Sequence, residues 1–285
     1  MSLLLALVAA ALTMTAPSLT ITAASRSMQP GELVVLSIAS PTPLTAVRAR
    51  AFGTDIAGFV LSENDAQHWR VLVGIDLDAK PGPHAVVVTA TSAAGPLEAT
   101  YQLNVVAKKF PTRRLKVDEG FVNPPAEAMP RIEAEQKEQA AIWAASATSR
   151  LWAGPFVRPV DDPANSAFGT RSIFNGQPRG AHSGADFLSP AGRPVKAPNA
   201  GRVVLAKDLY YSGNCVIIDH GLGVFTYFAH FSKIDVAVGD TVTPGQVVGL
   251  VGATGRVTGA HLHWSLRVSG ARVDPLALLA LLGKH

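Results

Sequence analysis

The sequence predicts a mainly β protein with an amino-terminal immunoglobulin-like sandwich, a helical linker and a carboxy-terminal antiparallel β-sheet domain. Short β-branched segments separated by Gly and Pro recur through most of the 285 residues. A single stretch rich in Glu and Lys, with helical spacing of its apolar residues, interrupts them. The composition, 48% hydrophobic and 16% charged, is typical of globular protein and not of disorder.

Residues 1–18 are predicted to be a signal peptide. The apolar run LLLALVAAAL at 3–12 is shorter than the ~20 residues that a membrane-spanning helix needs, and no other stretch is longer and free of charge. The basic residue that usually precedes such a run is absent, so a buried first strand or a retained lipid-facing anchor is the alternative. We therefore expect an exported protein whose mature chain has no transmembrane span.

Residues 19–107 are expected to form the sandwich. Segments such as "PGELVVLSIAS", "LTAVRARAFG" and "QHWRVLVGID" are strand-like and are separated by turn signals without a helical period. His68 and His84 fall in these segments, and neither has a second ligand residue at metal-binding spacing. Both are interpreted as ordinary histidines.

Residues 108–150 are expected to form a linker. They open with the basic, proline-containing "KKFPTRR" and then become helical, with Pro130 at the helix start and Ile132, Ala140 and Trp143 at roughly helical spacing. The helix could guard a cleft, although a spacer packed between two domains is the preferred interpretation.

Residues 151–285 are again strand-rich, with Gly at the corners, until the apolar "PLALLALLGKH". The net charge of +4 lies entirely in this part, because acidic and basic residues balance in the first 150. Such an excess suits an anionic polymer, but the basic runs with interleaved aromatic residues of a nucleic-acid surface are absent. We expect no nucleic-acid partner. The single cysteine, Cys215, excludes an internal disulfide.

Histidines are concentrated in three segments of this domain: "HSGAD" (His182, Asp186), "YFAHFS" (His230) and "HLHW" (His261, His263). Residues i and i+2 of a strand share one face, so the last two imidazoles stand next to each other. A hydrolytic zinc site typically takes three protein ligands and keeps one position open. The domain contains no Glu, so surplus histidines would have to serve as the acid or base.

The segments "RGAHSGADFLSPAGRPVKAPNAGRVV" and "VIIDHGLGVFTYFAHFSKIDVAVGDTVTPGQVVGLVGATGRVTGAHLHWSLR" resemble the LytM/lysostaphin family of zinc metallopeptidases, which cut peptidoglycan peptides. The resemblance covers roughly residues 150–280 and carries the ordered series H-x-x-x-D, H and H-x-H. It implies a zinc endopeptidase acting on peptidoglycan, with one Zn²⁺ per chain, in the periplasm or associated with the cell envelope. The implied zinc ligands are His182, Asp186 and His263, and the implied catalytic histidines are His230 and His261.

Further residues are candidates for binding substrate. Arg171, in the entry segment "FGTRS", could hold a substrate carboxylate, and Tyr227 could contact substrate from the strand that leads to His230. With Arg179 and Arg256, Arg171 would suit a D-Ala to diamino acid cross-link, which carries free carboxylates, better than a glycine bridge. His220, in a turn, is interpreted as structural.

Some relatives carry an upstream residue that plugs the zinc site, and three residues could do so here: Asn123, Asp161 and Asn165. The alternative function is a catalytically inactive LytM-type regulator that binds and activates a cell-wall amidase, so a cell-wall protein partner is possible. Such regulators have lost zinc ligands, whereas all are present here. A biotinyl- or lipoyl-type carrier domain could share the hairpin "GDTVTPGQVVG", but no modifiable lysine stands at a matching turn.

Overall fold

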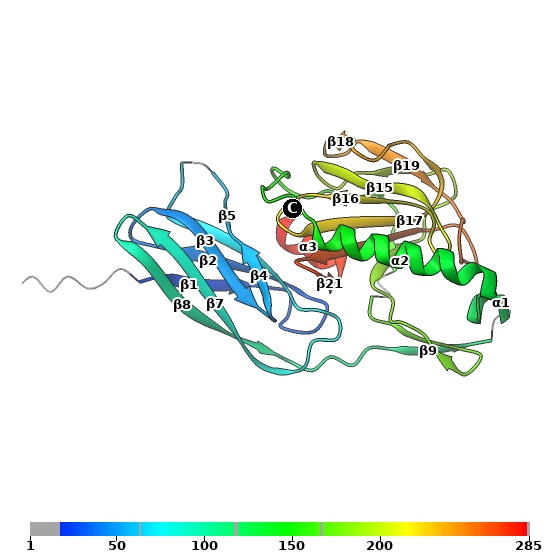
Figure 1. The fold of residues 1–285 in the computed structure, drawn as a ribbon, viewed down its shortest axis with the longest axis horizontal. Coiled ribbons are helices and arrows are strands. Elements are labelled where there is room, and N and C mark those ends of the chain that lie inside the picture. The colour runs from blue at the N-terminus through cyan, green and yellow to red at the C-terminus, as the bar shows by residue number, and fades with distance from the viewer. Residues whose placement is uncertain (1–17, 63, 117–118, 166–167, 284–285) are drawn as a thin grey trace, which may run out of the picture.

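The computed structural model describes residues 18–62, 64–116, 119–165 and 168–283, so the predicted signal peptide lies almost wholly outside the described residues. Figure 1 shows two β-rich lobes side by side, with a long helix lying along the second. We call residues 19–105 the sandwich and residues 151–283 the carboxy-terminal lobe. No helix in the described ranges combines the length and the apolar character that crossing a bilayer requires.

The sandwich consists of two four-stranded sheets in which all neighbouring strands are antiparallel, as the sequence predicts. The immunoglobulin-like assignment of its topology stays a prediction. One sheet has the order β1-β2-β6-β5 (Thr20–Ala24, Leu33–Ala39, His68–Gly74, Phe59–Val60). The other has the order β4-β3-β7-β8 (Thr54–Ala57, Leu44–Ala51, Gly82–Ser92, Gly95–Val105).

Strand β2 is buried on both faces, which explains its unbroken apolar sequence "LVVL". Val34 and Leu36 point into the core of the sandwich. Leu33 and Val35, on the other face, join the core of the carboxy-terminal lobe, where Phe59 packs edge-on against Trp152. The two lobes therefore share apolar packing.

The carboxy-terminal lobe is built on a ten-stranded sheet that contains the predicted hairpins. Its main path runs β10-β13-β20-β17-β16-β15-β18 (Ala164–Asn165, Gly184–Phe187, Leu262–Val268, Val224–Ile234, Gly213–Asp219, Gly201–Leu209, Thr241–Val242). Three further strands pair with this path or with each other: β14 (Pro194–Lys196), β19 (Val247–Val251) and β21 (Ala271–Val273). A separate three-stranded sheet has the order β12-β11-β9 (Gln177–Pro178, Arg171–Phe174, Thr112–Leu115).

The helical part of the linker at 108–150 lies along the carboxy-terminal lobe (Figure 1). The two ends of the linker also contact the sandwich, with Lys108 3.6 Å from Glu32 and the Arg150 guanidinium over the Phe59 ring. After β9 the linker forms α1 (Glu119–Val122), η1 (Ala126–Ala128) and α2 (Met129–Ala144). Trp143 of α2 packs edge-on against Phe225 of β17, with ring centroids 5.4 Å apart. Glu135, also on α2, is buried and accepts a 2.9 Å hydrogen bond from the backbone N–H of Tyr210. The helix therefore covers part of one face of the main sheet.

Charged side chains close the contact between the lobes. Arg272 of β21 makes a two-point contact with Asp76, with Nη2–Oδ1 and Nε–Oδ2 distances of 2.6 and 3.1 Å, and also contacts Asp78. Arg26 bridges Glu32 and Asp274, and Asp274 caps helix α3 (Pro275–Leu282) by accepting from the N–H of Leu276. Burial alone would raise the pKa of Asp76, but the hydrogen bonds from Arg272 outweigh it and lower that pKa to about 2.

Arg272→Ala is expected to lower the free energy of unfolding at neutral pH by about 1 kcal/mol, because the contact with Asp76 is partly screened by solvent. The pKa of Asp76 is depressed in the folded state, so this contribution is complete above the unfolded pKa near 3.8 and fades as the pH falls toward 2. Denaturant titrations at several pH values measure it.

The matched control for Arg272→Ala is Arg50→Ala, which removes an exposed ion pair to Asp55 within the sandwich. That change is expected to have little effect at any pH. Equal destabilisation by the two substitutions, or a cost of Arg272→Ala that persists unchanged at pH 2, would contradict the role assigned to Arg272.

Candidate active site

The register of two neighbouring strands brings the predicted metal ligands together. Asp186 of β13 stands directly opposite His263 of β20, and the alternate residues Phe187 and Trp264 turn into the core. His182 lies two residues before β13, where its backbone N–H and C=O pair with Thr170 O and Gly169 N at 2.9 and 2.7 Å. The three side chains therefore project from fixed backbone.

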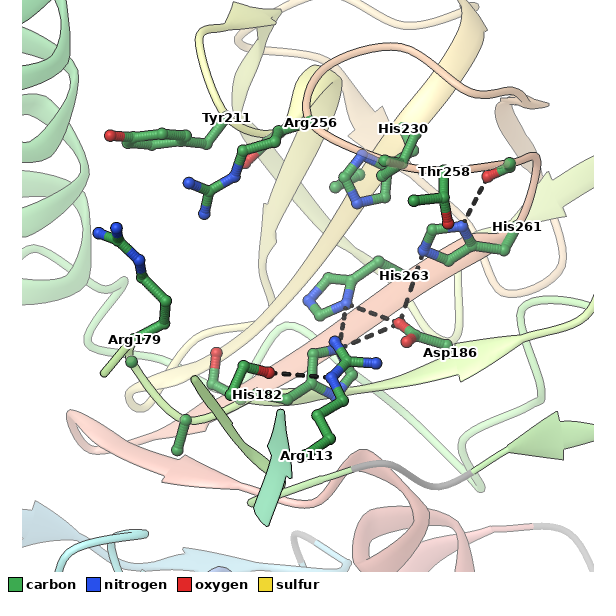
Figure 2. A pocket seen from close by; sticks show the side chains of 18 of the residues that line it. Arg113, Arg179, His182, Asp186, Tyr211, His230, Arg256, Thr258, His261 and His263 are labelled. Carbon is green, nitrogen blue, oxygen red and sulfur yellow. Dashed lines mark hydrogen bonds and ion pairs between the residues drawn. The ribbon is translucent and has the colours of Figure 1, made fainter. Parts of the chain in front are cut away.

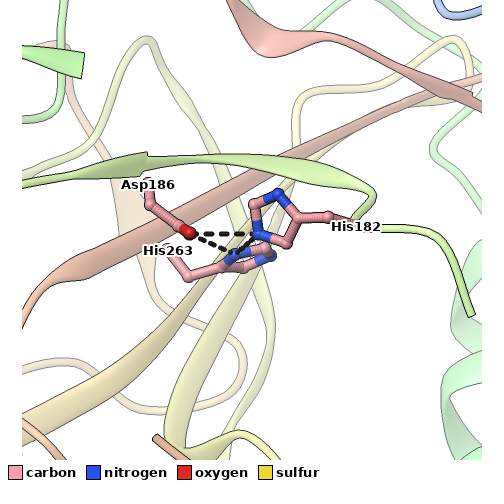
Figure 3. A group of neighbouring side chains, drawn as sticks. All are labelled: His182, Asp186 and His263. Carbon is pink, nitrogen blue, oxygen red and sulfur yellow. Dashed lines mark hydrogen bonds and ion pairs between the residues drawn. The ribbon is translucent and has the colours of Figure 1, made fainter. Parts of the chain in front are cut away.

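Three ligand atoms converge in this cluster (Figure 3). His182 Nε2 lies 3.1 Å from Asp186 Oδ1 and 3.0 Å from His263 Nδ1, and the last two atoms are 3.0 Å apart. One ion can contact all three at the ~2.0–2.2 Å typical of zinc bound to nitrogen and oxygen. Among the described residues, this is the one His/Cys/Asp/Glu group with such spacing. The donor set, two imidazoles and a carboxylate, fits zinc.

Neighbouring groups fix the chemical state of the cluster. His263 Nε2 lies 2.7 Å from Ser265 Oγ, two residues along the same strand face, so Ser265 can hold the ring with Nδ1 toward the cluster. Burial lowers the pKa of His263, which favours the neutral imidazole that a metal requires. Burial opposes ionisation of Asp186, yet hydrogen bonds with His182 and His263 hold its pKa well below the usual range.

The two predicted catalytic histidines lie beside the cluster with the same tautomer. His230 Nδ1 lies 3.0 Å from Thr254 O, and His261 Nδ1 lies 2.9 Å from Gly259 O. A carbonyl oxygen only accepts, so in each neutral ring Nδ1 carries the proton and Nε2 keeps its lone pair. The ring centroids are 4.9 Å apart, and His261 Nε2 is 3.8 Å from Asp186 Oδ1. The pKa of His230 is lowered to about 4, mainly because the ring is buried and also because His263 and His261 lie nearby.

An irregularity in strand β17 sets the orientation of the His230 side chain. His230 has φ of 67°, an uncommon conformation for a residue with a side chain. The pairing of β17 with β16 shifts register across His230, and its pairing with β19 shifts just after Phe231. The backbone N–H of His230 donates to Ser212 O, in the turn between β15 and β16. Close contact between this turn and the segment carrying Thr254 requires Gly213 and Gly255, since a Cβ on either would meet the other segment within 2.3 Å.

The metal cluster and the two histidines beside it line a groove of about 800 Å³ (Figure 2). Tyr211, Arg179 and Arg256 line it as well, and the Arg256 guanidinium stacks on the Tyr211 ring 4.3 Å from its centroid. Asp186 is the one carboxylate among the described residues that line the groove, and it belongs to the metal cluster. The groove therefore offers cationic groups to a substrate.

The structure separates the two predicted substrate-binding residues. Tyr227 lines the groove, with its ring 6.3 Å from that of His263. Arg171 is not among the lining residues; it is exposed on β11 with Nη2 3.3 Å from Asp78 Oδ1 of the sandwich. His220 is fully buried between Ala200 O and Thr226 Oγ1, which confirms its structural interpretation.

None of the three candidate zinc-plugging residues is among the described residues that line the groove. Asn123 is exposed and its amide donates to Glu119, and Asp161 is exposed near Lys196. The backbone of Asn165 pairs with that of Asp186, while its side chain lies outside the described parts.

Sequence reasoning missed several residues that shape the site: Arg113, Ser172, Tyr211, Thr254 and Ser265. For Ser265 the two-residue spacing from His263 was an available signal. The others reach the site through pairings between distant segments, which leave no local pattern in the sequence.

Comparisons with known proteins identify the family to which the chain belongs. The family described as peptidase family M23 matches residues 180–275. The crystal structure of a putative peptidase M23 from Pseudomonas aeruginosa is 33% identical and has a TM-score of 0.67, with 89% of this chain and 95% of that chain covered. Because 89% of this chain is covered, the similarity to that structure includes residues outside the carboxy-terminal lobe.

Two curated relatives match over about a third of this chain. Peptidoglycan DD-endopeptidase ShyA of Vibrio cholerae is 46% identical over 95 residues, which are 33% of this chain and 22% of that protein. DD-carboxypeptidase/endopeptidase Mpg of Neisseria meningitidis is 41% identical over 97 residues, which are 34% of this chain and 22% of that protein. The match thus spans about a fifth of the length of these relatives. The chain belongs to peptidase family M23, and the predicted resemblance to its LytM-type metalloendopeptidases is confirmed.

Proposed function

We propose that the protein is a zinc-dependent endopeptidase that hydrolyses peptide cross-links in bacterial peptidoglycan. The observation that carries this proposal is the convergence of His182, Asp186 and His263 beside two imidazoles whose Nε2 atoms keep their lone pairs. The names of the relatives, peptidoglycan DD-endopeptidase and DD-carboxypeptidase/endopeptidase, support peptidoglycan as the substrate.

The proposed mechanism divides the work between the cluster and the two histidines. Zinc held by His182, Asp186 and His263 would supply a Lewis acid that polarises a peptide carbonyl and acidifies water. His230 and His261 can each accept a proton at Nε2, because their Nδ1 protons are committed to backbone carbonyls. Once protonated, either imidazolium can donate a hydrogen bond to the negatively charged oxygen that develops on the attacked carbonyl, or return the proton to the leaving amine.

We propose that the cleaved bond is the amide that links D-Ala to a diamino acid. Such a cross-link carries free carboxylates near the scissile amide, whereas a glycine bridge has none beside it. Arg179 and Arg256 line the groove, and Tyr211 orients the Arg256 guanidinium. A planar guanidinium binds a carboxylate through two parallel hydrogen bonds, which supports this choice of substrate.

The proposed substrate lies outside the cytoplasm, so we also propose an exported protein of the periplasm or cell envelope. The alternative, an inactive regulator of an amidase, would require the metal site to be lost, whereas all three ligand residues are present and converge. A cell-wall protein partner is compatible with both the endopeptidase and the regulator.

The metal assignment predicts that the purified protein binds one Zn²⁺ per chain. His263→Ala should lose zinc, because two ligands form an incomplete shell, and it should stay folded, because the core of the lobe is formed by other side chains. Elemental analysis with circular dichroism measures both. His84→Ala, on the sandwich, is the control and should keep full occupancy. Full zinc occupancy in His263→Ala would refute the assignment.

The mechanism predicts different behaviour for the adjacent histidine. His261→Ala should keep its zinc and lose activity by about 10²- to 10³-fold, the usual cost of removing one donor that stabilises a transition state. Turnover of a cross-linked muropeptide, measured on zinc-loaded protein, tests this. Unchanged turnover in His261→Ala would assign the proton-transfer role to His230 alone.

Digestion of defined substrates tests the proposed function directly. The zinc-loaded protein should release monomers from muropeptide dimers joined through D-Ala and a diamino acid, and mass spectrometry should locate the cut at that amide. Pentaglycine-linked wall is the comparison substrate and should be cut more slowly. Faster cleavage of pentaglycine would overturn the choice of bond, and no cleavage of either would overturn the proposed function.

A further inference from the structure

Strand β9 brings part of the linker to the groove. Its four residues, Thr112–Leu115, pair in parallel with β11 in a register that sets Arg113 opposite Ser172. All four side chains of β9 are exposed, so the burial of apolar side chains does not explain why the strand lies there. The strand also lies well before residues 180–275, which match the M23 family.

The alternation of side chains along β9 gives its two faces different surroundings. Arg113 and Leu115 line the groove, whereas the intervening Arg114 does not. Arg113 Nε donates a 2.9 Å hydrogen bond to Ser172 Oγ, and Ser172 is itself buried. Figure 2 shows the Arg113 side chain reaching from β9 into the groove, on the side away from Tyr211 and Arg256. The guanidinium is therefore held in place by a fixed partner.

The charge around Arg113 indicates the kind of group that it binds. Arg179 and Arg256 are the other cationic side chains among the described lining residues, and the one carboxylate, Asp186, belongs to the metal cluster. With Nε committed to Ser172, the edge formed by the two Nη groups of Arg113 suits the two oxygens of a carboxylate. A peptide lying across the metal cluster could thus meet an arginine on each side of it.

We propose that Arg113 is a specificity-determining residue that binds a carboxylate of the cross-linked peptide, on the side of the metal cluster away from Arg256. This inference rests on the proposed function for the identity of the substrate. It makes the linker part of the substrate-binding groove, so the binding unit extends beyond residues 151–285.

The experiment compares two substitutions on one strand. Arg113→Gln and Arg114→Gln remove the same charge from neighbouring residues, but only Arg113 faces the groove. Binding is measured by calorimetry on full-length, zinc-loaded protein that also carries His261→Ala, which slows cleavage. The ligands are a muropeptide dimer with free diamino acid carboxylates and the same dimer with those carboxylates amidated. Thermal unfolding checks that both variants stay folded.

Arg113→Gln should weaken binding of the free-carboxylate dimer about tenfold, equivalent to about 1.4 kcal/mol, and leave binding of the amidated dimer unchanged. Arg114→Gln should bind both dimers as its parent does. Equal effects of the two substitutions, or an equal loss for both ligands in Arg113→Gln, would overturn the inference.

The binding measurement keeps this inference separate from the proposed function. Cleavage of the dimers by the protein with His261 intact tests hydrolysis, whereas the Arg113 comparison needs no turnover. Absence of cleavage together with a selective loss in Arg113→Gln would overturn the endopeptidase proposal and support carboxylate binding by Arg113. Absence of measurable binding of either dimer to the parent protein would overturn the role of Arg113.

Discussion

The pairing of β13 with β20 is the constraint on which the site depends. Asp186 and His263 are direct cross-strand neighbours, and their ligand atoms are 3.0 Å apart. A shift of one residue along either strand would turn one ligand into the core and bring Phe187 or Trp264 to the groove. Phe187 and Trp264 are fully buried, and the free-energy cost of exposing them fixes the register of the two strands. The same register fixes the positions of Asp186 and His263.

One face of the main sheet is buried and the other is partly covered, which confines the groove to the uncovered part of that second face. One face forms the core shared with the sandwich, while α2 covers part of the other through Trp143. Glu135 of the same helix holds the backbone of Tyr210, next to the Tyr211 ring on which Arg256 stacks. The linker helix therefore supports a wall of the groove as well as covering the sheet.

The parts of the structure that were predictable from sequence carry their signal locally. The segments "HSGAD" and "HLHW" contain all three converging residues, and the resemblance to the LytM/lysostaphin family assigned them as ligands. Gly- and Pro-bounded strands predicted the β architecture. The parallel pairing of β9 with β11 could not be predicted, because four exposed residues have no apolar pattern and their partner lies over fifty residues away. Arg171 was a reasonable substrate candidate by sequence, yet its position in the fold places it against Asp78.

The contact of Arg171 with Asp78 lies next to the wall of the groove. Asp78 of the sandwich contacts both Arg171 of β11 and Arg272 of β21. Ser172, the next residue on β11, holds the guanidinium of Arg113. Because side chains alternate along β11, Arg171 can face the sandwich while Ser172 faces the groove. The short strand β11 therefore contacts the sandwich through Arg171 and supports the groove wall through Ser172, so the two lobes meet directly beside the groove.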